Sequence, residues 1–554
     1  MSPIGEHPSL GGKQIGIQST MGGMQLTVGM MLRRADAMGP HAKLVGITPG
    51  GRVERTWPGL ASRARRVAAA LPSLGVRPGD RVATFAWNGL RHLELFFGVP
   101  ASGAVLQPLN VRLFPEQLAW IAAHAGDRVV FVDAALTAQL AALRPMLTGV
   151  ETYVVLPDGT TPHPDFADAL DYEDLLAGVP DTEPSDVDER TAACLCYTSG
   201  TTGNPKGVVY SHRSLTLHAM SGCFVDSFAV AERDTVLPLT PLFHATSWGL
   251  PYTAALAGAG LVLAGHDTSA PTVVELIRRE GVTLAAGVPT FWLAVDQVAG
   301  DELGSLRRIL CGGSAIPMEL IRRYHRRGVT VQQGWGMTEM SPSGALTSVR
   351  RHLADLPEEE RLALHATQGV VTAGVELRVV DPTGDVLTPG SGAGEIEVRG
   401  PWVTGSYLDP DDDSNDSRFH DGWLRTGDVG TVDADGYLHL LDRAKDLIKS
   451  GGEWISSIEL ENHLMAHPGV AQAMVIAVPD PHWAERPAAL VVRADSGPEV
   501  TAEDLRAHLR ARVAKWMVPE SVEFVAELPT TGTGKFDKKA ARAAWRKRSE
   551  EERV

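Results

Sequence analysis

The chain has little cysteine: Cys194, Cys196, Cys223 and Cys311 are the only four among 554 residues. They form no C-x-x-C pair and show no metal-ligand spacing, which argues against a cysteine metal site. So few thiols suit a reducing compartment, so we predict a cytoplasmic protein. Cys194 and Cys196 flank one residue of a predicted strand, where we interpret them as small buried side chains.

Positive charge is also scarce. Lys and Arg number 51 against 67 Asp and Glu, a formal net charge of −16. This balance argues against a nucleic-acid partner and against an anionic membrane surface. The hydrophobic fraction of 44% is ordinary for a globular protein. The length is too great for one core and predicts two to four domains.

Long membrane-spanning runs are missing. The N-terminus lacks an apolar core followed by a cleavage site, so we predict no secretory segment. From Thr235 to Gly265 there is no Asp, Glu, Lys or Arg, a length that could span a bilayer. However, Pro238, Pro241 and Pro251 break this stretch and His244 lies inside it. We therefore predict buried strands and a helix that line a pocket, and no transmembrane segment.

Strand-like and helix-like patterns alternate from the N-terminus to about residue 290. Helices are expected after Thr27 and Thr56, which can cap them, and over residues 89–98. Strands are expected over 82–86 and 128–133. This alternation predicts an α/β fold with parallel sheets.

A polar, glycine-rich loop separates two predicted strands, residues 192–196 and 208–210. Glycine allows close backbone approach, consecutive N–H groups can bind an anion, and hydroxyls and a lysine add donors and charge. The loop lacks the usual G-x-x-x-x-G-K-[ST] pattern, because Gly207 follows the lysine. A mobile surface linker is the alternative. The residues predicted to hold nucleotide phosphates are Thr198, Ser199, Gly200, Thr201, Thr202, Gly203 and Lys206.

The run from Tyr197 to Gly207 resembles the signature of the adenylate-forming enzymes, which include acyl-CoA synthetases, luciferases and carrier-loading adenylation domains. The resemblance covers about residues 24–542. The order of segments 110–118 and 128–133 resembles the medium- and long-chain fatty acyl-CoA synthetase branch. Membership would imply ATP, Mg²⁺ and coenzyme A as ligands, and a homodimer.

Two later motifs match the same family. Leu242–Trp248 resembles the motif beside the acyl carboxylate, which implies a catalytic His244, binding roles for Ala245 and Trp248, and a tunnel gate at Trp248. Plain core packing is the alternative for both His244 and Trp248. In Gln333–Glu339, Thr338 can donate to the α-phosphate and Glu339 can bind Mg²⁺ together with Thr198; an ordinary glycine-rich turn is the alternative. The resemblance implies that Gly313, Gln333, Gly334, Trp335 and Thr338 bind the nucleotide.

The resemblance also assigns roles near the C-terminus. Asp428 would accept hydrogen bonds from the ribose hydroxyls, and Asp442 would be a hinge. Around it, Arg443 and Lys445 would face the nucleotide, and the loop with Lys449 and Trp454 would serve the second half-reaction. Lys535, between two glycines, matches the catalytic lysine. We therefore predict a large N-terminal domain of parallel-rich α/β sheets (residues 1–441) and a small mobile α+β C-terminal domain (residues 442–554).

The predicted chemistry has two steps. A carboxylate attacks the α-phosphate of ATP, releasing pyrophosphate, and a thiol then displaces AMP from the acyl-adenylate. Medium- or long-chain fatty acids are the first expectation, and short thioether or aromatic acids the second. An amine or carrier protein could replace coenzyme A. Luciferase chemistry uses the same motifs, and a non-catalytic binding relative is the remaining alternative, which the intact Lys535 and Glu339 oppose.

Overall fold

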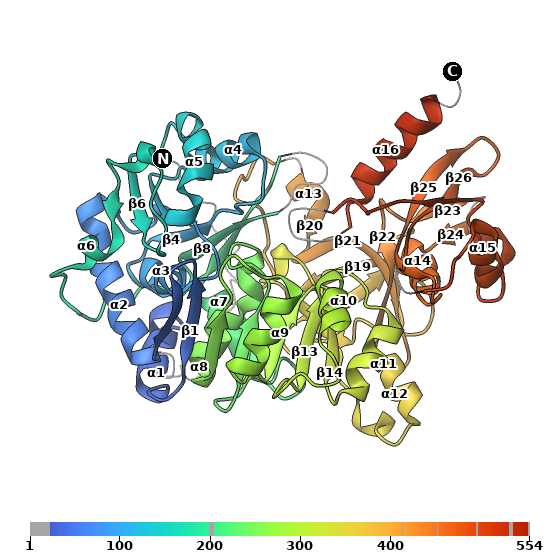
Figure 1. Ribbon diagram of the computed structural model, residues 1–554, viewed down its shortest axis with the longest axis horizontal. Helices are drawn as coiled ribbons and strands as arrows, with labels where there is room; N and C mark the ends of the chain where they lie inside the picture. The colour runs from blue at the N-terminus through green and yellow to red at the C-terminus, as the bar shows by residue number, and fades with distance from the viewer. Residues whose placement is uncertain are drawn as a thin grey trace, which may run out of the picture.

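In its described residues the chain forms four β-sheets with helices packed on them (Figure 1). The computed structural model describes residues 23–198, 204–412, 414–450, 453–494, 497–530 and 536–551. Elements up to β22 form a large N-terminal part, and those from β23 onward lie together at the right of Figure 1. The predicted fold class, a large parallel-rich α/β domain followed by a smaller α+β domain, is confirmed.

The first sheet has seven strands. Its order is β7 (Leu170–Asp171), β6 (Thr152–Leu156), β5 (Val129–Asp133), β3 (Arg81–Phe85), β4 (Val105–Pro108), β8 (Ala192–Tyr197) and β9 (Gly207–Ser211). Neighbouring strands are parallel from β7 to β8, and only β9 runs antiparallel. The strands predicted over 82–86, 128–133 and 192–196 are confirmed. The antiparallel pair β8–β9 holds the two ends of the glycine-rich loop.

The second sheet has nine strands and is parallel from β1 to β14. Its order is β16 (Val370–Val371), β15 (Ser343–Leu346), β14 (Thr330–Gly336), β13 (Arg308–Gly312), β12 (Leu284–Gly287), β10 (Thr235–Pro238), β11 (Gly260–Leu263), β1 (Leu44–Thr48) and β2 (Gly51–Arg55). Parallel strands end at one edge of a sheet, where α/β folds bind ligands. The motifs after β10, β13 and β14 therefore meet at one edge.

The uncharged stretch from Thr235 to Gly265 is part of this sheet and its cover. It contains β10, helix α8 (Leu250–Ala257) and β11, whose residues are buried almost throughout. The prediction of buried strands and a helix is confirmed. None of the helices in the described ranges combines the length and apolar character needed to cross a membrane.

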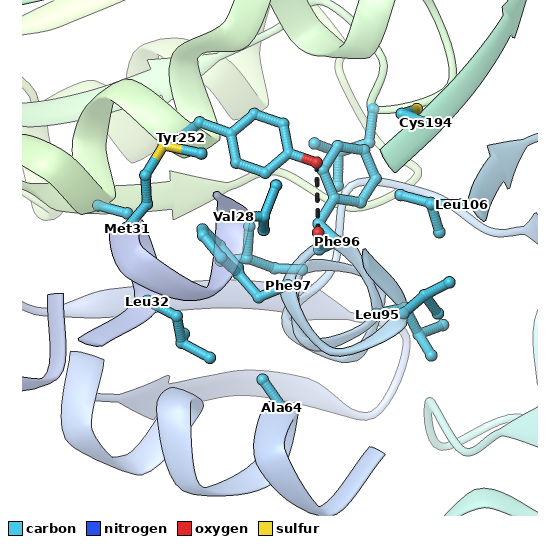
Figure 2. Packing of buried hydrophobic residues seen from close by; sticks show 14 of the residues in the cluster. Val28, Met31, Leu32, Ala64, Leu95, Phe96, Phe97, Leu106, Cys194 and Tyr252 are labelled. Carbon is cyan, nitrogen blue, oxygen red and sulfur yellow. Dashed lines mark hydrogen bonds between the residues drawn. The ribbon is translucent and has the colours of Figure 1, made fainter. Parts of the chain in front are cut away.

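The N-terminal helices begin where their caps predict. Thr27 accepts a hydrogen bond from the Met30 amide at the start of α1 (Val28–Met38), and Thr56 caps α2 (Trp57–Ala70) in the same way. Helix α3 (Leu90–Ala101) packs Phe96 and Phe97 against Tyr252 of α8 (Figure 2). The Tyr252 hydroxyl donates to the Phe96 carbonyl at 3.2 Å, so the buried phenol is satisfied. The remaining N-terminal helices are α4 (Pro115–Ala125), α5 (Thr137–Leu143), α6 (Tyr172–Leu176), α7 (His212–Gly222), α9 (Ala270–Arg279), α10 (Pro289–Val298), α11 (Met318–Arg326), α12 (Glu358–Leu364) and α13 (Ser414–Arg418).

The third and fourth sheets follow in the chain. The third is antiparallel and contains β17 (Glu376–Val380), β18 (Val386–Leu387), β19 (Gly394–Arg399), β20 (Phe419–His420), β21 (Trp423–Val432) and β22 (Leu438–Arg443). The fourth contains β23 (Ile448–Ser450), β24 (Glu453–Ile455), β25 (Val470–Asp480), β26 (Ala484–Arg493) and β27 (Ser521–Phe524), with helices α14 (Ser457–Met465), α15 (Ala502–Arg510) and α16 (Lys538–Glu551). Helix α15 ends at Arg510, and Val513 packs on the core from the following turn.

Candidate active site

A cavity of about 310 Å³ opens at the edge where β8, β13 and β14 end. It is bordered by both described ends of the glycine-rich loop, by the turn after β10 and by the motif that follows β14. Motifs far apart in the sequence therefore share one cavity. The predicted residues that line it are Thr198, Lys206, His244, Ala245, Trp248, Gly313, Gly334, Trp335, Thr338, Glu339 and Arg443. Ser199, Gly200, Thr201, Thr202, Gly203 and Lys535 lie outside the described residues.

The two ends of the glycine-rich loop are joined to each other. The Thr198 amide donates to the Lys206 carbonyl at 2.9 Å, and the Lys206 amide donates to the Thr198 hydroxyl at 3.1 Å. These bonds continue the β8–β9 ladder, so both described ends of the loop are fixed to a sheet. Phosphate-binding groups need such fixed positions, because a preorganised donor costs no reordering when the anion arrives.

The Lys206 ammonium already has anionic and polar partners. It lies 2.7 Å from an Asp412 carboxylate oxygen, donates to the Ser414 hydroxyl, and lies 5.1 Å from the centre of the Tyr407 ring. Burial works to raise the pKa of the Asp412 carboxyl, but hydrogen bonds from Lys206 and Ser414 outweigh it and lower this pKa to about 2. Asp412 is therefore ionised at any pH at which the protein would act.

Glu339 is buried at the other side of the cavity. The Tyr407 hydroxyl donates to its carboxylate at 2.7 Å, and the Arg418 guanidinium lies 3.7 Å away. Burial raises the pKa of Tyr407, so the phenol keeps its proton for this bond. The preceding residue, Thr338, is held by its carbonyl, which accepts from Tyr210 at 2.6 Å. Glu339 is thus a fixed, buried oxygen donor of the kind that a hard cation prefers.

Asp428, the predicted ribose acceptor, is held by two other predicted residues. The Trp335 indole N–H donates to one carboxylate oxygen at 2.7 Å, and the Arg443 Nε lies 3.3 Å from the other. Asp428 and Arg443 are directly paired between β21 and β22, and Trp335 reaches them from β14. Two sheets therefore converge on this carboxylate and fix its direction.

The turn after His244 is left-handed. Residues 245–248 all have positive φ angles, from +37° to +57°, although none of them is glycine. This region of backbone space costs about 1–2 kcal/mol for each L-residue. Buried contacts hold the turn: the Thr246 hydroxyl lies 2.9 Å from the Cys196 thiol, and the Ser247 hydroxyl donates to the Thr240 carbonyl at 2.8 Å. In this left-handed conformation the Trp248 side chain lies at the cavity wall.

Two glycines border the site because neighbouring atoms leave no room for a side chain. A Cβ on Gly336 would lie 1.6 Å from the Pro342 carbonyl oxygen, so the backbone itself fills that space. A Cβ on Gly312 would lie 3.3 Å from the tip of the Trp248 ring. Glycine at 336 allows β14 to lie against the Pro342 backbone, and glycine at 312 allows β13 to lie against the Trp248 ring.

Besides Asp428, which adjoins the cavity through Trp335, four described predicted residues lie away from the cavity wall. The Gln333 side chain accepts from the Ile316 amide at 2.9 Å and donates to the Ala366 carbonyl, so it joins β14 to neighbouring loops. Lys449 and Trp454 face each other across the β23–β24 hairpin. Lys445 lies between β22 and β23, where burial lowers its pKa.

Asp442 joins the third sheet to helix α14. Its carboxylate accepts from the Ser457 amide at 3.0 Å and from the Ser457 hydroxyl. The Lys538 ammonium donates to the same hydroxyl and lies 2.8 Å from Glu461. A buried polar network therefore surrounds the predicted hinge residue.

Sequence reasoning missed Tyr407, Ser414 and Arg418, which line the cavity, and Asp412, which contacts Lys206. They come from the segment between β19 and β20, whose several acids look unsuited to a phosphate site. The sequence did hold a signal. This acidic run shortly precedes Asp428, the predicted ribose acceptor, and its charge is opposite to that of the phosphate-loop lysine. In the described part of the chain, no three His, Cys, Asp or Glu side chains gather into a metal cluster.

Comparisons with known proteins give a consistent result. Residues 32–408 match the model of the AMP-binding enzymes, and residues 459–535 match the AMP-binding enzyme C-terminal domain. The chain is 45% identical over 534 residues to a long-chain-fatty-acid–CoA ligase of Thermus thermophilus, covering 95% of this chain and 97% of that one. It is also 45% identical over 506 residues to a 3-methylmercaptopropionyl-CoA ligase of Ruegeria pomeroyi, covering 90% and 93%. The crystal structure of the anthranilate CoA ligase AuaEII with anthranoyl-AMP superposes with a TM-score of 0.84 at 28% identity, covering 94% and 98%.

Proposed function

The chain belongs to the AMP-binding enzyme family, and we propose that it is an ATP-dependent carboxylic acid–CoA ligase that forms an acyl-adenylate and then an acyl-CoA thioester. One observation carries this proposal. The ends of the phosphate loop, the buried Glu339, the Trp335–Asp428 pair and the His244–Trp248 turn border or adjoin one cavity. Such a cavity can hold a nucleotide and a carboxylic acid together.

In the first step, the carboxylate attacks the α-phosphorus of ATP and pyrophosphate leaves. Negative charge grows around phosphorus, and fixed donors and cations are the main means of stabilising it. Lys535 supplies that cation, Thr338 donates to the α-phosphate, and residues 198–206 hold the β- and γ-phosphates. Asp428 accepts from the ribose, Gly313, Gly334 and Trp335 pack along the base, and His244 and Ala245 adjoin the acyl carboxylate.

The residues present fit a magnesium ion. Glu339 is a buried carboxylate that faces the cavity, and Thr198 has a hydroxyl at the cavity wall. Mg²⁺ binds through one or two protein oxygens plus phosphates. When bound there, it would neutralise phosphate charge.

In the second step, the thiol of coenzyme A attacks the acyl-adenylate and AMP leaves. We propose that residues 442–554 rotate about Asp442, which withdraws Lys535 and brings Lys449 and Trp454 toward the acyl group. Such hinge motion is a known type of transition. The proposed boundary is supported by the sheets, because β22 ends at Arg443 and the next sheet begins at Ile448. Arg443 and Lys445 then lie at the hinge itself.

Two substrate classes have support. Medium- or long-chain fatty acids agree with the name of the Thermus thermophilus relative. A short thioether or aromatic acid is the second candidate, favoured by the bulky Trp248 and Phe228 side chains in the cavity wall. We also propose a homodimer, from the resemblance, and a cytoplasmic location, from the free cysteines.

The deciding experiment measures pyrophosphate release with ATP and Mg²⁺ over a panel of carboxylic acids, with and without coenzyme A. Products are identified by mass. We expect acid-dependent release with acyl-CoA formation, and the panel ranks the acids by kcat/KM. Release without any CoA thioester would assign an amine or carrier-protein acceptor instead. Nucleotide binding without release from any acid would overturn the ligase and favour a non-catalytic relative.

A further inference from the structure

One short segment, residues 407–418, contacts both charged groups that a nucleotide would need. Its Asp412 and Ser414 bind Lys206, and its Tyr407 and Arg418 hold Glu339. The segment precedes β20 and includes α13, beside the cavity.

A carboxylate oxygen and a hydroxyl already occupy the Lys206 ammonium, where phosphate oxygens would otherwise bind. The ammonium has a carboxylate at 2.7 Å and a hydroxyl in hydrogen-bond range, and both side chains of the ion pair are about three-quarters buried. A carboxylate and a phosphate cannot both lie against one ammonium without strong mutual repulsion at low effective dielectric. Phosphate binding at Lys206 therefore requires that Asp412 moves away from the ammonium, or else the repulsion between carboxylate and phosphate weakens binding.

The cation of this segment, Arg418, lacks a full set of partners. Within the described residues, the Arg418 Nε is buried without a hydrogen-bond partner, and its guanidinium approaches Glu339 only to 3.7 Å. Buried donors without partners are costly, so an arriving anion would gain a ready partner here. The same movement that removes Asp412 from Lys206 would leave two cations facing the cavity.

We propose that Asp412, with Ser414, is an internal competitor of the nucleotide phosphates for Lys206 and thereby sets the affinity of the enzyme for ATP. The proposal rests on the proposed function for the identity of the ligand. Its consequence is specific: the competitor affects ligands whose β- and γ-phosphates reach Lys206, and it leaves AMP binding unchanged. A purely structural role for Asp412 would alter both ligands alike.

The test is calorimetric titration of the full-length protein with ATP and with AMP, in EDTA and without acid. Asp412→Asn keeps the shape and removes the charge, and Asp411→Asn is the matched control, since Asp411 is an exposed acid of the same segment. We expect Asp412→Asn to bind ATP about three- to tenfold more tightly than wild type. AMP affinity should stay the same, and Asp411→Asn should behave as wild type.

Two further variants make the outcome decisive. In a Lys206→Ala background the effect of Asp412→Asn on ATP should shrink, because the contested cation is gone. Ser414→Ala should tighten ATP binding by a smaller factor. ATP affinity that is unchanged or weaker in Asp412→Asn would overturn the proposal, as would equal gains for ATP and AMP.

Failure of the proposed function would look different. If Asp412→Asn tightens ATP binding but no acid yields pyrophosphate, the competitor stands and the ligase falls. If wild type binds neither ATP nor AMP, both fall together.

Discussion

The proposed nucleotide side and the proposed acyl side of the cavity are held by different forces. The nucleotide side consists of ion pairs and charged hydrogen bonds: Lys206–Asp412, Glu339–Arg418 and Asp428–Arg443. The acyl side consists of a strained left-handed turn held by neutral hydroxyl and thiol contacts and by backbone packing. A charged side chain can replace its protein partner with a charged ligand group, whereas a packed turn discriminates between ligands by their shape. Single charge changes should therefore alter nucleotide steps, and single volume changes should alter acid selection.

The largest effect should come from Lys535→Ala. Removing the cation from the α-phosphate should lower adenylate formation by about 100- to 1000-fold. Thioester formation from a supplied acyl-adenylate should continue, which stopped-flow assays of each half-reaction can measure. Lys547→Ala, an exposed lysine of α16, is the control. Equal loss of both half-reactions would contradict the division of roles.

Acid should destabilise the fold through its buried histidines. His218 lies against Gly249, directly after the left-handed turn. Burial lowers the pKa of His218 to about 4, and it lowers the pKa of His92 to about 4 as well. The histidines of the unfolded chain bind protons below pH 6.5, whereas the buried ones do not. The contribution of these two histidines to the free energy of unfolding is therefore fully present above pH 6.5 and is lost as the pH falls toward 4. The loss should reach roughly 3 kcal/mol for each histidine.

Urea unfolding between pH 7.5 and 4.5 measures this slope. Asp412, with its pKa of about 2, does not titrate in that range. A His218→Gln variant that still folds should show a shallower slope. Equal slopes in the wild type and in His218→Gln would disprove the assignment; this comparison is needed because Asp133, whose pKa burial raises to about 7, gains stability as the pH falls and offsets the histidines.

Asp428→Asn should weaken the nucleotide side alone. The amide keeps the shape but loses the charge that pairs with Arg443, and charged hydrogen bonds are worth about 1.5–3 kcal/mol. We expect KM for ATP to rise about tenfold while the ranking of acids stays the same. Asp421→Asn, at an almost fully exposed carboxylate, is the control. An altered acid ranking would show that the two sides are not independent.

The smallest effect should come from Trp248→Ala on the acyl side. Removing the ring from its position against Gly312 enlarges the cavity, so kcat/KM should rise a few-fold for longer acids and fall for short ones. KM for ATP should not change. Trp483→Ala, at an exposed tryptophan of the C-terminal part, controls for general damage. Kinetics across an acid series give the result, and a uniform loss for every acid would contradict a role in length selection.

Local chemistry in the sequence determined much of this protein. Caps at Thr27 and Thr56, alternating apolar patterns and the glycine-rich loop predict helices, parallel strands and a phosphate site, because each depends on residues close together in the chain. In the Gln333–Glu339 motif, close packing against the Pro342 carbonyl explains why residue 336 is glycine. The sequence showed this glycine only as part of a pattern.

Only the tertiary structure decided which of these residues act together. Lys206 meets Asp412 across 206 positions, and Trp335 meets Asp428 across 93, distances at which no periodicity in the sequence gives information. Gln333 belongs to the predicted motif, yet its side-chain amide bonds the Ile316 amide and the Ala366 carbonyl, which come from loops that the motif itself does not contain. The left-handed turn likewise exists because buried partners from β8 and the end of β10 hold it, and local preference alone would not select it.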